Sequence, residues 1–229
     1  MKFKLMGKYK QGEISPCFIF EIKPSCFSYY DIIAYMVKDE QGKNKSDNEL
    51  VALTLKDEEN FLFLIKRYED KLTRYIRRIS NFSPEKSEDV LQEIFIKAYR
   101  SLNNFDKDLK FSSWLYRIAH NTVISEYRKE KSRPEYFLGE KNDKILDSLK
   151  SDLDLAREVD LRYLKKSIYK ILNSMDRKYE EALVLKFFED KDYKEISDIL
   201  KKPMGTVATL ISRAKKQFKE KVKELEIEM

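Results

Sequence analysis

Apolar side chains recur every three or four residues along most of the chain, as they do on one face of an amphipathic helix. The pattern is clearest within residues 61–79, 90–102 and 114–124, and it returns within 161–172 and 179–188. Almost no stretch shows the two-residue alternation of a β-strand. The sequence therefore predicts an all-α fold.

Residues suited to capping predict where several of these helices begin. A serine and an aspartate at 46–47 can start a short helix. Pro84 follows Ser83 at a helix start, where the N–H that proline lacks would have no partner anyway. Ser112 or Ser113 is predicted to cap a helix that runs to about residue 131.

The pattern also divides the chain into parts. We assign residues 1–46 to a poorly ordered N-terminal extension, 47–133 to a first helical domain, 134–160 to a linker and 161–229 to a second helical domain. The linker lacks a clean period and carries eight acidic and four basic residues. For residues 1–35, a short regulatory arm is the alternative. The predicted architecture is two small helical domains on a flexible acidic tether.

The second domain contains a pattern typical of a helix-turn-helix. Tyr193, Ile196 and Ile199 share one face of a short helix, and Pro203 stops that helix because proline disfavours helical geometry in the residue before it. A second, basic helix opens near Gly205. This arrangement places one helix in the DNA major groove. A purely structural hairpin is the alternative, and the basic cluster argues against it.

Charge along the chain favours a nucleic-acid partner. The formal net charge is +6 and the isoelectric point about 9.0. Residues 201–223 hold eight basic residues and one acidic residue, and residues 110–133 hold six basic and two acidic residues. Lysine and arginine beside DNA phosphates release counterions, which gives affinity without sequence choice.

Aromatic and basic residues alternate between 105 and 133, a mixture that suits single-stranded DNA because exposed bases stack on flat rings. The other interpretation is that Trp114 and Tyr127 belong to the core, and for Trp114 we favour it. His120 has no second ligand in sight, and we interpret it as a polar surface or groove residue.

Several classes of protein are disfavoured. Two cysteines and one histidine cannot build a zinc cluster of ordinary spacing. A glycine-rich phosphate loop and a metal-spaced acidic triad are both missing from the sequence. We therefore predict no catalytic residue, no metal, no cofactor and no small-molecule substrate. Apolar runs are too short to span a bilayer, and prolines interrupt the N-terminal apolar stretch, so we expect a cytoplasmic protein without membrane insertion.

Three motifs in order carry a family resemblance. They are Glu88-Asp-Val-Leu-Gln-Glu-Ile-Phe-Ile-Lys-Ala-Tyr-Arg100, then Phe111-Ser-Ser-Trp-Leu-Tyr-Arg-Ile-Ala-His-Asn-Thr-Val-Ile-Ser-Glu-Tyr-Arg-Lys129, then the module from Tyr193 to Lys216. Together they resemble the extracytoplasmic-function (ECF) group of bacterial RNA polymerase sigma factors, over about residues 47 to 226. The resemblance implies an alternative sigma factor whose region 2-like and region 4-like domains direct promoter-specific transcription initiation.

The resemblance also implies partners and site residues. The partners are core RNA polymerase, through its β′ clamp and β flap, and promoter DNA. Docking on the clamp would fall to Asp89, Gln92 and Glu93. The −10 element would be bound by Asn103, Lys110, Ser112, Arg117, His120, Asn121, Ser125, Arg128 and Lys129, and the −35 element by Lys202, Gly205, Thr206, Ala208, Thr209, Ser212, Arg213 and Lys216. An anti-sigma factor fits the resemblance, although no residue of the sequence identifies one.

One departure from the family bears on the −35 sequence. Ala208 and Leu210 stand where family members often carry basic residues, so two candidate contacts to guanine are missing. Contacts to thymine methyl groups or recognition of DNA shape would take a larger share. A free-standing helix-turn-helix regulator that never joins polymerase is the alternative function, and it would need a dimer interface.

Overall fold

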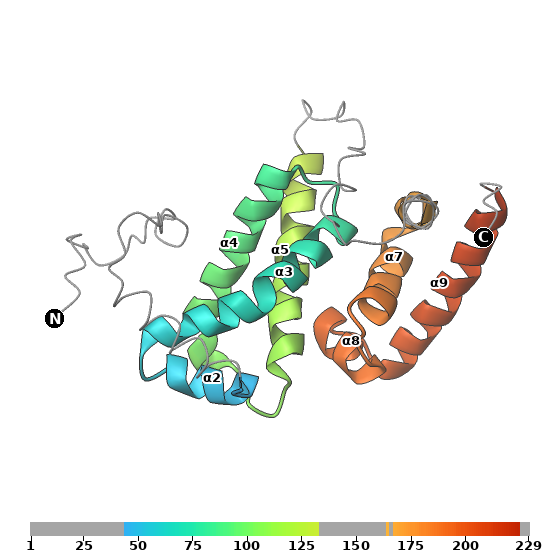
Figure 1. The fold of residues 1–229 in the computed structure, drawn as a ribbon. Helices are drawn as coiled ribbons and strands as arrows, with labels where there is room; N and C mark the ends of the chain where they lie inside the picture. The colour runs from blue at the N-terminus through green and yellow to red at the C-terminus, as the bar shows by residue number, and fades with distance from the viewer. Residues whose placement is uncertain (1–43, 133–163, 165–166, 225–229) are drawn as a thin grey trace, which may run out of the picture. The chain divides into compact units, whose positions relative to one another are not determined.

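A computed structural model describes residues 44–132, 164 and 167–224. Helices account for the secondary structure of these residues, and none of the described residues lies in a β-strand (Figure 1). The predicted all-α class is therefore confirmed. The expected N-terminal extension at 1–46, apart from its last three residues, and the expected linker at 134–160 lie outside the described residues.

The first part of the fold is a four-helix module. It comprises α2 (Asp47–Thr54), α3 (Phe61–Ile79), α4 (Pro84–Arg100) and α5 (Phe111–Lys131), with short 3-10 turns η3 (Glu58–Asn60) and η4 (Leu102–Asn104) between them. Its interior is apolar and includes Leu64, Leu72, Tyr75, Ile76, Ile94 and Leu115, each at most 1% exposed. Fully burying an aliphatic side chain of this size contributes about 1.5–3 kcal/mol, so this stripe of side chains holds the helices together.

Two of the predicted helix starts are confirmed. Ser46 and Glu49 form a capping box at α2, in which each side chain satisfies a backbone N–H of the other residue. Ser83 caps α4 through Lys86 N, with Pro84 in the first turn. The carboxylate of Asp47 then joins α2 to α3, because it binds Arg67 at 2.7 Å.

The predicted start of α5 is wrong by two or three residues. Lys110, not Ser112 or Ser113, occupies the N-cap position, and it makes no side-chain cap bond. The hydroxyl of Ser113 is instead buried without a hydrogen-bond partner. The ring of Phe111, 2% exposed, packs 5.5 Å from the ring of Phe105. Burial of that ring therefore sets the first turn of the helix in place of a capping hydroxyl.

The aromatic side chains of this segment belong mostly to the core. Trp114 is 6% exposed and its ring lies 5.3 Å from that of Phe105 and 5.5 Å from that of Phe111. Tyr116 is 2% exposed, whereas Tyr127 is 38% exposed. The core interpretation of Trp114 is therefore confirmed, and that of Tyr127 is wrong. Few of these rings are free to stack on bases in this structure.

The second part is the helix-turn-helix module, residues 167–224. Helical residues 167–173 precede α7 (Arg177–Leu183), a single π-helical turn η7 (Val184–Phe188), α8 (Tyr193–Leu200) and α9 (Met204–Glu224). The predicted break at 175–176 is confirmed. The helix expected at 179–188 begins two residues earlier and ends in the π-turn. Local periodicity does not distinguish α from π hydrogen bonding, so this change was not foreseeable.

The turn between α8 and α9 has specific local causes. Asp192 and Glu195 form a capping box that starts α8. Lys201 ends it in the left-handed conformation, with φ 54°, and the Ser197 hydroxyl donates to the Lys202 carbonyl at 2.6 Å. Pro203 then begins the approach to α9. The predicted helix-turn-helix is therefore present, with its boundaries where the sequence pattern changes.

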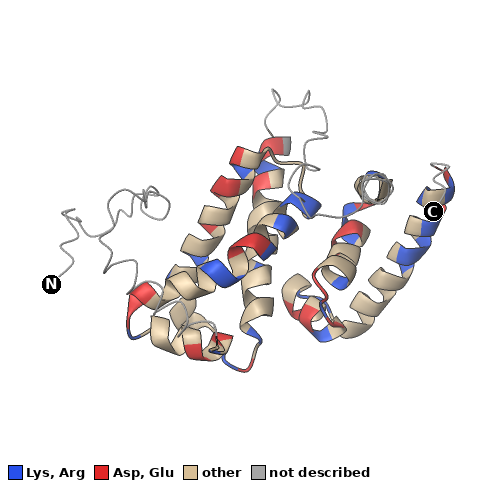
Figure 2. Ribbon diagram, in the orientation of Figure 1, with Lys and Arg blue, Asp and Glu red and all other residues tan. Residues whose placement is uncertain are grey.

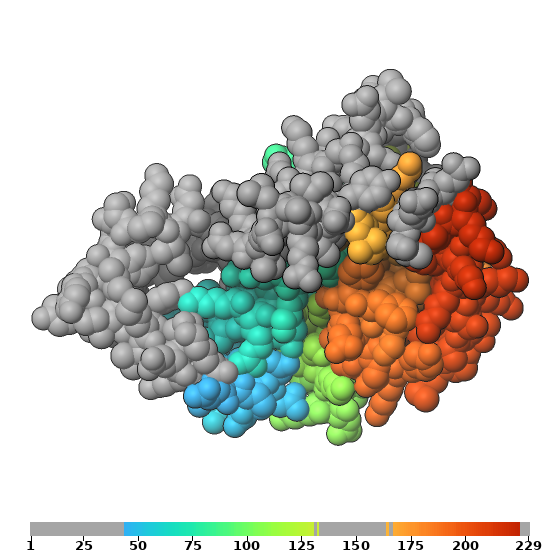
Figure 3. Space-filling model, turned by 45° about the vertical axis from the view of Figure 1, so that its right-hand side comes forward, coloured from blue at the N-terminus to red at the C-terminus, as the bar shows by residue number. Residues whose placement is uncertain are grey.

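Helices α2 to α9 belong to one compact unit, residues 46–229. Within it α8 packs along α5, and the turn η7 contacts α3. Figure 3 shows the orange residues of the helix-turn-helix module against the green residues of α5 and the teal residues of α3. This packing brings the two predicted DNA-binding segments onto neighbouring surfaces.

Candidate nucleic-acid interface and docking face

Helix α9 separates a buried stripe from an exposed face. Val207, Ile211 and Ala214 are at most 1% exposed and hold α9 against the rest of its module. The predicted −35 residues within α9 lie on its other sides: Gly205, Thr206, Thr209, Ser212, Arg213 and Lys216 are exposed, and Ala208 is half-buried. Lys202, in the turn before α9, is exposed as well. The arrangement leaves one whole face of α9 free for the major groove.

The glycine at the start of α9 opens onto solvent. A Cβ built at Gly205 meets no atom within 4 Å. Packing within the protein therefore does not demand glycine at this position. The Thr209 hydroxyl donates to the Gly205 carbonyl at 2.9 Å, which leaves the oxygen of that hydroxyl able to accept another hydrogen bond.

Positive charge follows the exposed face of α9 toward the C-terminal end of the helix (Figure 2). Lys215, Lys216 and Lys219 are all exposed. The ion pair of Lys216 with Glu220 is long, at 4.0 Å, and both side chains are more than half exposed. Such a pair contributes little, so these ammonium groups are available to phosphates.

The predicted −10 residues run along the outer sides of α5. Lys110, Asn121, Ser125, Arg128 and Lys129 are exposed, whereas Ser112, Arg117 and His120 are half-buried, and Asn103 is exposed on the preceding 3-10 turn. The structure thus brings eight of the nine residues onto one helix or its N-cap. One of these residues, Lys129, pairs with Glu126 of the same helix, and the ammonium and carboxylate are 2.5 Å apart.

A cleft of about 680 Å³ separates this part of α5 from the helix-turn-helix module. His120, Tyr127 and Arg128 line it from α5. Arg177 lies opposite, its guanidinium 4.0 Å from the centre of the Tyr127 ring. Other lining residues are Ile124, Ser132, Lys178, Glu181, Leu200 and Lys202. The cleft is therefore rich in cationic side chains.

Burial in this cleft lowers the pKa of His120 below its ordinary value. Arg177 and Lys202 lower it further, while Glu181 opposes them. The hydroxyl of Tyr75 lies 3.4 Å from Nδ1 of the imidazole. The imidazole is therefore neutral in the folded protein at neutral pH, so it serves as a hydrogen-bonding group and not as a cation.

The depressed pKa makes a prediction about pH. The unfolded chain binds a proton at the ordinary histidine pKa of about 6.5, before the folded protein does, so the free energy of unfolding falls as pH drops through that value. His120→Gln should remove this part of the slope in denaturant unfolding between pH about 7.5 and 5.5. Because the chain has one histidine, the imidazole proton resonances give its pKa directly. A measured pKa above that of the unfolded chain would contradict the prediction.

The predicted docking face lies on α4. Asp89 is exposed and Gln92 and Glu93 are half-buried, and their spacing of three and four residues puts them on one side of the helix. Glu93 pairs with Lys97 at 2.7 Å, as its spacing predicts, with both side chains at least 40% exposed. The pair is worth a few tenths of a kcal/mol, so it does not prevent these groups from binding a partner.

Sequence patterns missed the groups that join the two modules. Arg78 binds Glu189 at 2.6 Å across 111 residues of chain. A pair so distant leaves no periodic signal. Glu195 had a local signal, its capping box with Asp192, but that signal gives no indication that Lys110 lies 3.4 Å from its carboxylate.

Neither a metal site nor a membrane span is found in the described ranges. None of their helices is long and apolar enough to cross a bilayer. Among the same residues, no group of three histidine, cysteine, aspartate or glutamate side chains could hold a metal ion.

Each of the two modules matches a known protein family. The model of sigma-70 region 2 matches residues 64–133, and a model of sigma-70 region 4 matches residues 165–218. The chain is 34% identical over 176 residues to the ECF RNA polymerase sigma factor SigW of Bacillus subtilis, covering 74% of this chain and 92% of SigW. It is 31% identical over 175 residues to the ECF RNA polymerase sigma-E factor of Escherichia coli K12, and the match covers 74% of this chain and 90% of that protein.

Solved structures share the fold. CnrH, determined in complex with the cytosolic domain of CnrY, superposes with a TM-score of 0.58 at 21% identity, over 79% of this chain and 99% of that chain. The sigma factor RpoE, determined in complex with the anti-sigma factor NepR from Bartonella quintana, gives a TM-score of 0.57 at 22% identity. That match covers 72% of this chain and 97% of RpoE.

Proposed function

Because this chain belongs to the ECF group of RNA polymerase sigma factors, we propose that its two helical modules divide the recognition of one promoter between them. The helix-turn-helix module takes the −35 element, the four-helix module takes the −10 element, and α4 holds the protein on core polymerase. The observation that carries the proposal is the exposed face of α9, polar and cationic, on a helix whose opposite stripe is buried.

At the −35 element, α9 enters the major groove with its N-terminal half facing base edges. Arg213 is the cation best suited to a bidentate contact with guanine, and Thr206 and Thr209 offer hydroxyl and methyl groups. Ala208 and Leu210 cannot donate hydrogen bonds through their side chains. We therefore expect a −35 sequence in which thymine methyl groups or groove shape carry part of the specificity.

At the −10 element, the exposed side of α5 binds the separated strand. Lys110 and Arg128 supply charge for phosphates, and Asn121 supplies an amide for a base edge. Asn103 lies in the segment before α5, where a base flipped from the stack would be held. Unstacking such a base costs a few kcal/mol, which stacking and hydrogen bonds must offset. Binding energy opens the DNA, so the protein catalyses no covalent step itself.

Two protein partners follow from the family. Asp89, Gln92 and Glu93 dock on the β′ clamp of core polymerase, and the helix-turn-helix module meets the β flap. CnrH and RpoE were solved with the cytosolic domain of CnrY and with the anti-sigma factor NepR. We extend that to this chain as a proposed anti-sigma partner. Transcription on the chromosome places the protein in the cytoplasm.

Run-off transcription tests the function. Core RNA polymerase is incubated with a library of genomic fragments, with and without the purified protein. We expect discrete transcripts that appear only when both proteins are present, and co-purification of the two. A free-standing regulator behaves differently, because it binds its operator tightly without the core. Tight promoter binding by the protein alone, with no transcript gained from core polymerase, would overturn the sigma assignment.

A further inference from the structure

A row of positive charge runs along one side of α3, and none of the predicted DNA-binding residues belongs to it. Its members, Arg67, Lys71, Arg74 and Arg78, follow one another at helical spacing and so lie on the same side of the helix. We call this set the α3 stripe. From Arg67 to Arg78 it is about 16 Å long at the usual helical rise. Glu69 faces away from the stripe by the same period, and Asp70 borders it.

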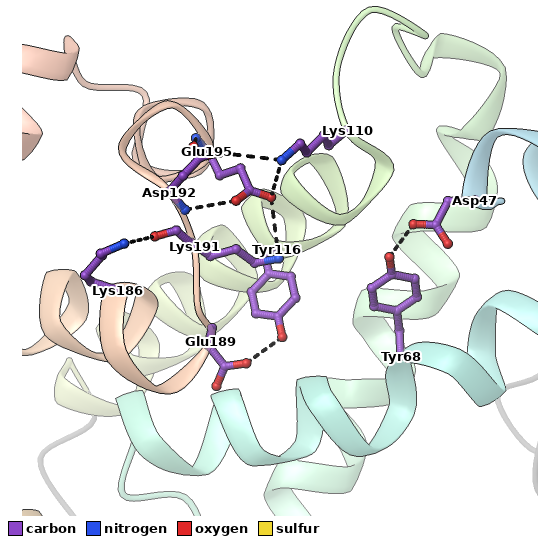
Figure 4. A network of polar contacts seen from close by, with 9 residues as sticks. All are labelled: Asp47, Tyr68, Lys110, Tyr116, Lys186, Glu189, Lys191, Asp192 and Glu195. Carbon is purple, nitrogen blue, oxygen red and sulfur yellow. Dashed lines mark hydrogen bonds and ion pairs between the residues drawn. The ribbon is translucent and has the colours of Figure 1, made fainter.

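Carboxylates of neighbouring elements occupy the two ends of the α3 stripe. The guanidinium of Arg67 binds Asp47 of α2 at 2.7 Å. At the other end, Nη1 of Arg78 lies 2.6 Å from Oε1 of Glu189. The second oxygen of that carboxylate accepts a hydrogen bond from the hydroxyl of Tyr116 on α5 (Figure 4). Both end arginines therefore hold neighbouring parts of the fold against α3.

The middle of the α3 stripe is different, because Lys71 and Arg74 are both exposed. Among the residues that the structure describes, neither has a carboxylate partner. The ammonium of Lys71 lies 5.4 Å from the centre of the Tyr68 ring, a contact that leaves its N–H donors available. The fold therefore presents two cations that it does not use itself, and the partner that suits them is an anion.

The exposed middle of the stripe adjoins the N-terminal end of α5. Helix α3 packs on α5, and the ring of Tyr68 lies 5.7 Å from that of Phe111 in the first turn of α5. Burial lowers the pKa of Lys191, and Lys71 and Lys110 both lie close enough to that ammonium to lower it further. Because Lys110 is one of the predicted −10 residues, the α3 stripe continues the −10 surface.

The stripe carries charge without the exposed rings that would stack on bases. Tyr68 and Tyr75 of α3 are at most 4% exposed, and Phe63 is half-buried. Stacking on aromatic side chains is how proteins hold the bases of a single strand. Lysine and arginine alone bind phosphates, which gives affinity without sequence choice. The chemistry of the stripe therefore fits the sugar-phosphate backbone of a nucleic acid and not its bases.

Resting on the proposed function, we propose that Lys71 and Arg74 form a phosphate track for the single DNA strand that leaves the −10 surface beside Lys110. The track holds the backbone of that strand whatever its sequence, and it extends the strand's contact from α5 onto α3. Both side chains are exposed in the structure as it stands. The free protein therefore needs no rearrangement of its helices to bind a strand there.

Fluorescence anisotropy on the full chain tests the track, with a labelled oligothymidine strand as the probe. The double variant Lys71→Gln/Arg74→Gln should weaken binding about tenfold at low salt. It should also reduce the slope of log Kd against log salt concentration by about 1.4, because each phosphate contact to a single strand contributes about 0.7. The end arginines are left in place, since they hold α2 and the helix-turn-helix module against α3.

Matched variants separate the track from net charge and from recognition of bases. Lys56→Gln/Arg100→Gln also removes one lysine and one arginine from exposed positions of the same module, but outside the stripe, and it should leave the slope nearly unchanged. Lys71→Arg/Arg74→Lys keeps both charges and should keep the wild-type slope. Far-ultraviolet circular dichroism of each variant checks that the helices are intact.

Several results would overturn the phosphate track. These are no binding of the probe by the wild-type protein at low salt, an unchanged slope in the stripe variant, and equal weakening in the two glutamine variants. A duplex of the same length whose binding falls as much as that of the single strand would overturn the assignment to a separated strand. Run-off transcription by the wild-type protein is unaffected by any of these results, and a lack of transcripts leaves the anisotropy comparison valid.

Discussion

Replacing Asp89, Gln92 and Glu93 together by alanine is expected to weaken binding to core RNA polymerase by roughly 10- to 100-fold, since a few central interface residues carry most of the binding energy. All three lie on one side of α4, and the structure gives each at least partial exposure. Affinity is measured by titrating labelled protein with core polymerase, and run-off transcript yield should fall in parallel at limiting protein.

The variant should keep its fold, which makes the result interpretable. Of the three side chains, Glu93 pairs with Lys97, and an exposed pair of this spacing contributes a few tenths of a kcal/mol. Asp70→Ala removes an exposed carboxylate from α3 of the same module and serves as the control. Equal loss of affinity in the control, or full affinity in the triple variant, would move the docking site away from this face.

Trp114→Ala is expected to lower the free energy of unfolding by about 3–5 kcal/mol, the usual cost of truncating a large buried aromatic residue. The ring is 6% exposed and packs against Phe105 and Phe111. Because the chain has one tryptophan, unfolding of the variant is followed by far-ultraviolet circular dichroism. The whole free energy of unfolding of a domain is about 5–15 kcal/mol. The substitution should therefore remove a large part of the stability of the four-helix module.

Trp114→Phe provides the comparison for this prediction. It keeps an aromatic ring between Phe105 and Phe111, so it should lower the free energy of unfolding clearly less than the alanine variant does. A loss of less than about 1 kcal/mol on truncation to alanine would mean that the ring is a surface group. In that case stacking on DNA, the interpretation that the structure disfavours, would regain support.

The helices could be predicted because their signals are local. The apolar spacing within α3 and α4 and the capping residues Ser46 and Ser83 each lie within a few residues of the feature that they specify. The start of α5 escaped prediction because a distant ring decides it: Phe111 packs 5.7 Å from Tyr68, more than forty positions earlier in the chain. Local rules offered Ser112 or Ser113 as the cap, but neither fills that position, and the Ser113 hydroxyl is buried.

The same contrast holds for the sites. Exposure of Thr206, Thr209 and Arg213 follows from the period of α9, which the sequence displays directly. The aromatic residues of α5 were harder to interpret, because rings that suit DNA bases also suit a core. The contact of Glu189 with Arg78 and Tyr116 could not be inferred, since it depends on how two separately patterned modules pack.

Glu195 shows how closely local folding and module packing are linked here. Its carboxylate accepts from Asp192 N at 2.9 Å, which closes the first turn of α8, and it also lies 3.4 Å from Lys110 and 4.0 Å from Lys191. A substitution at this position therefore shifts two equilibria at once, the fraying of a helix end and the release of a neighbouring domain. Because the same carboxylate serves both contacts, the stability of the α8 helix end and the packing of the two modules are coupled, although each module has a core of its own.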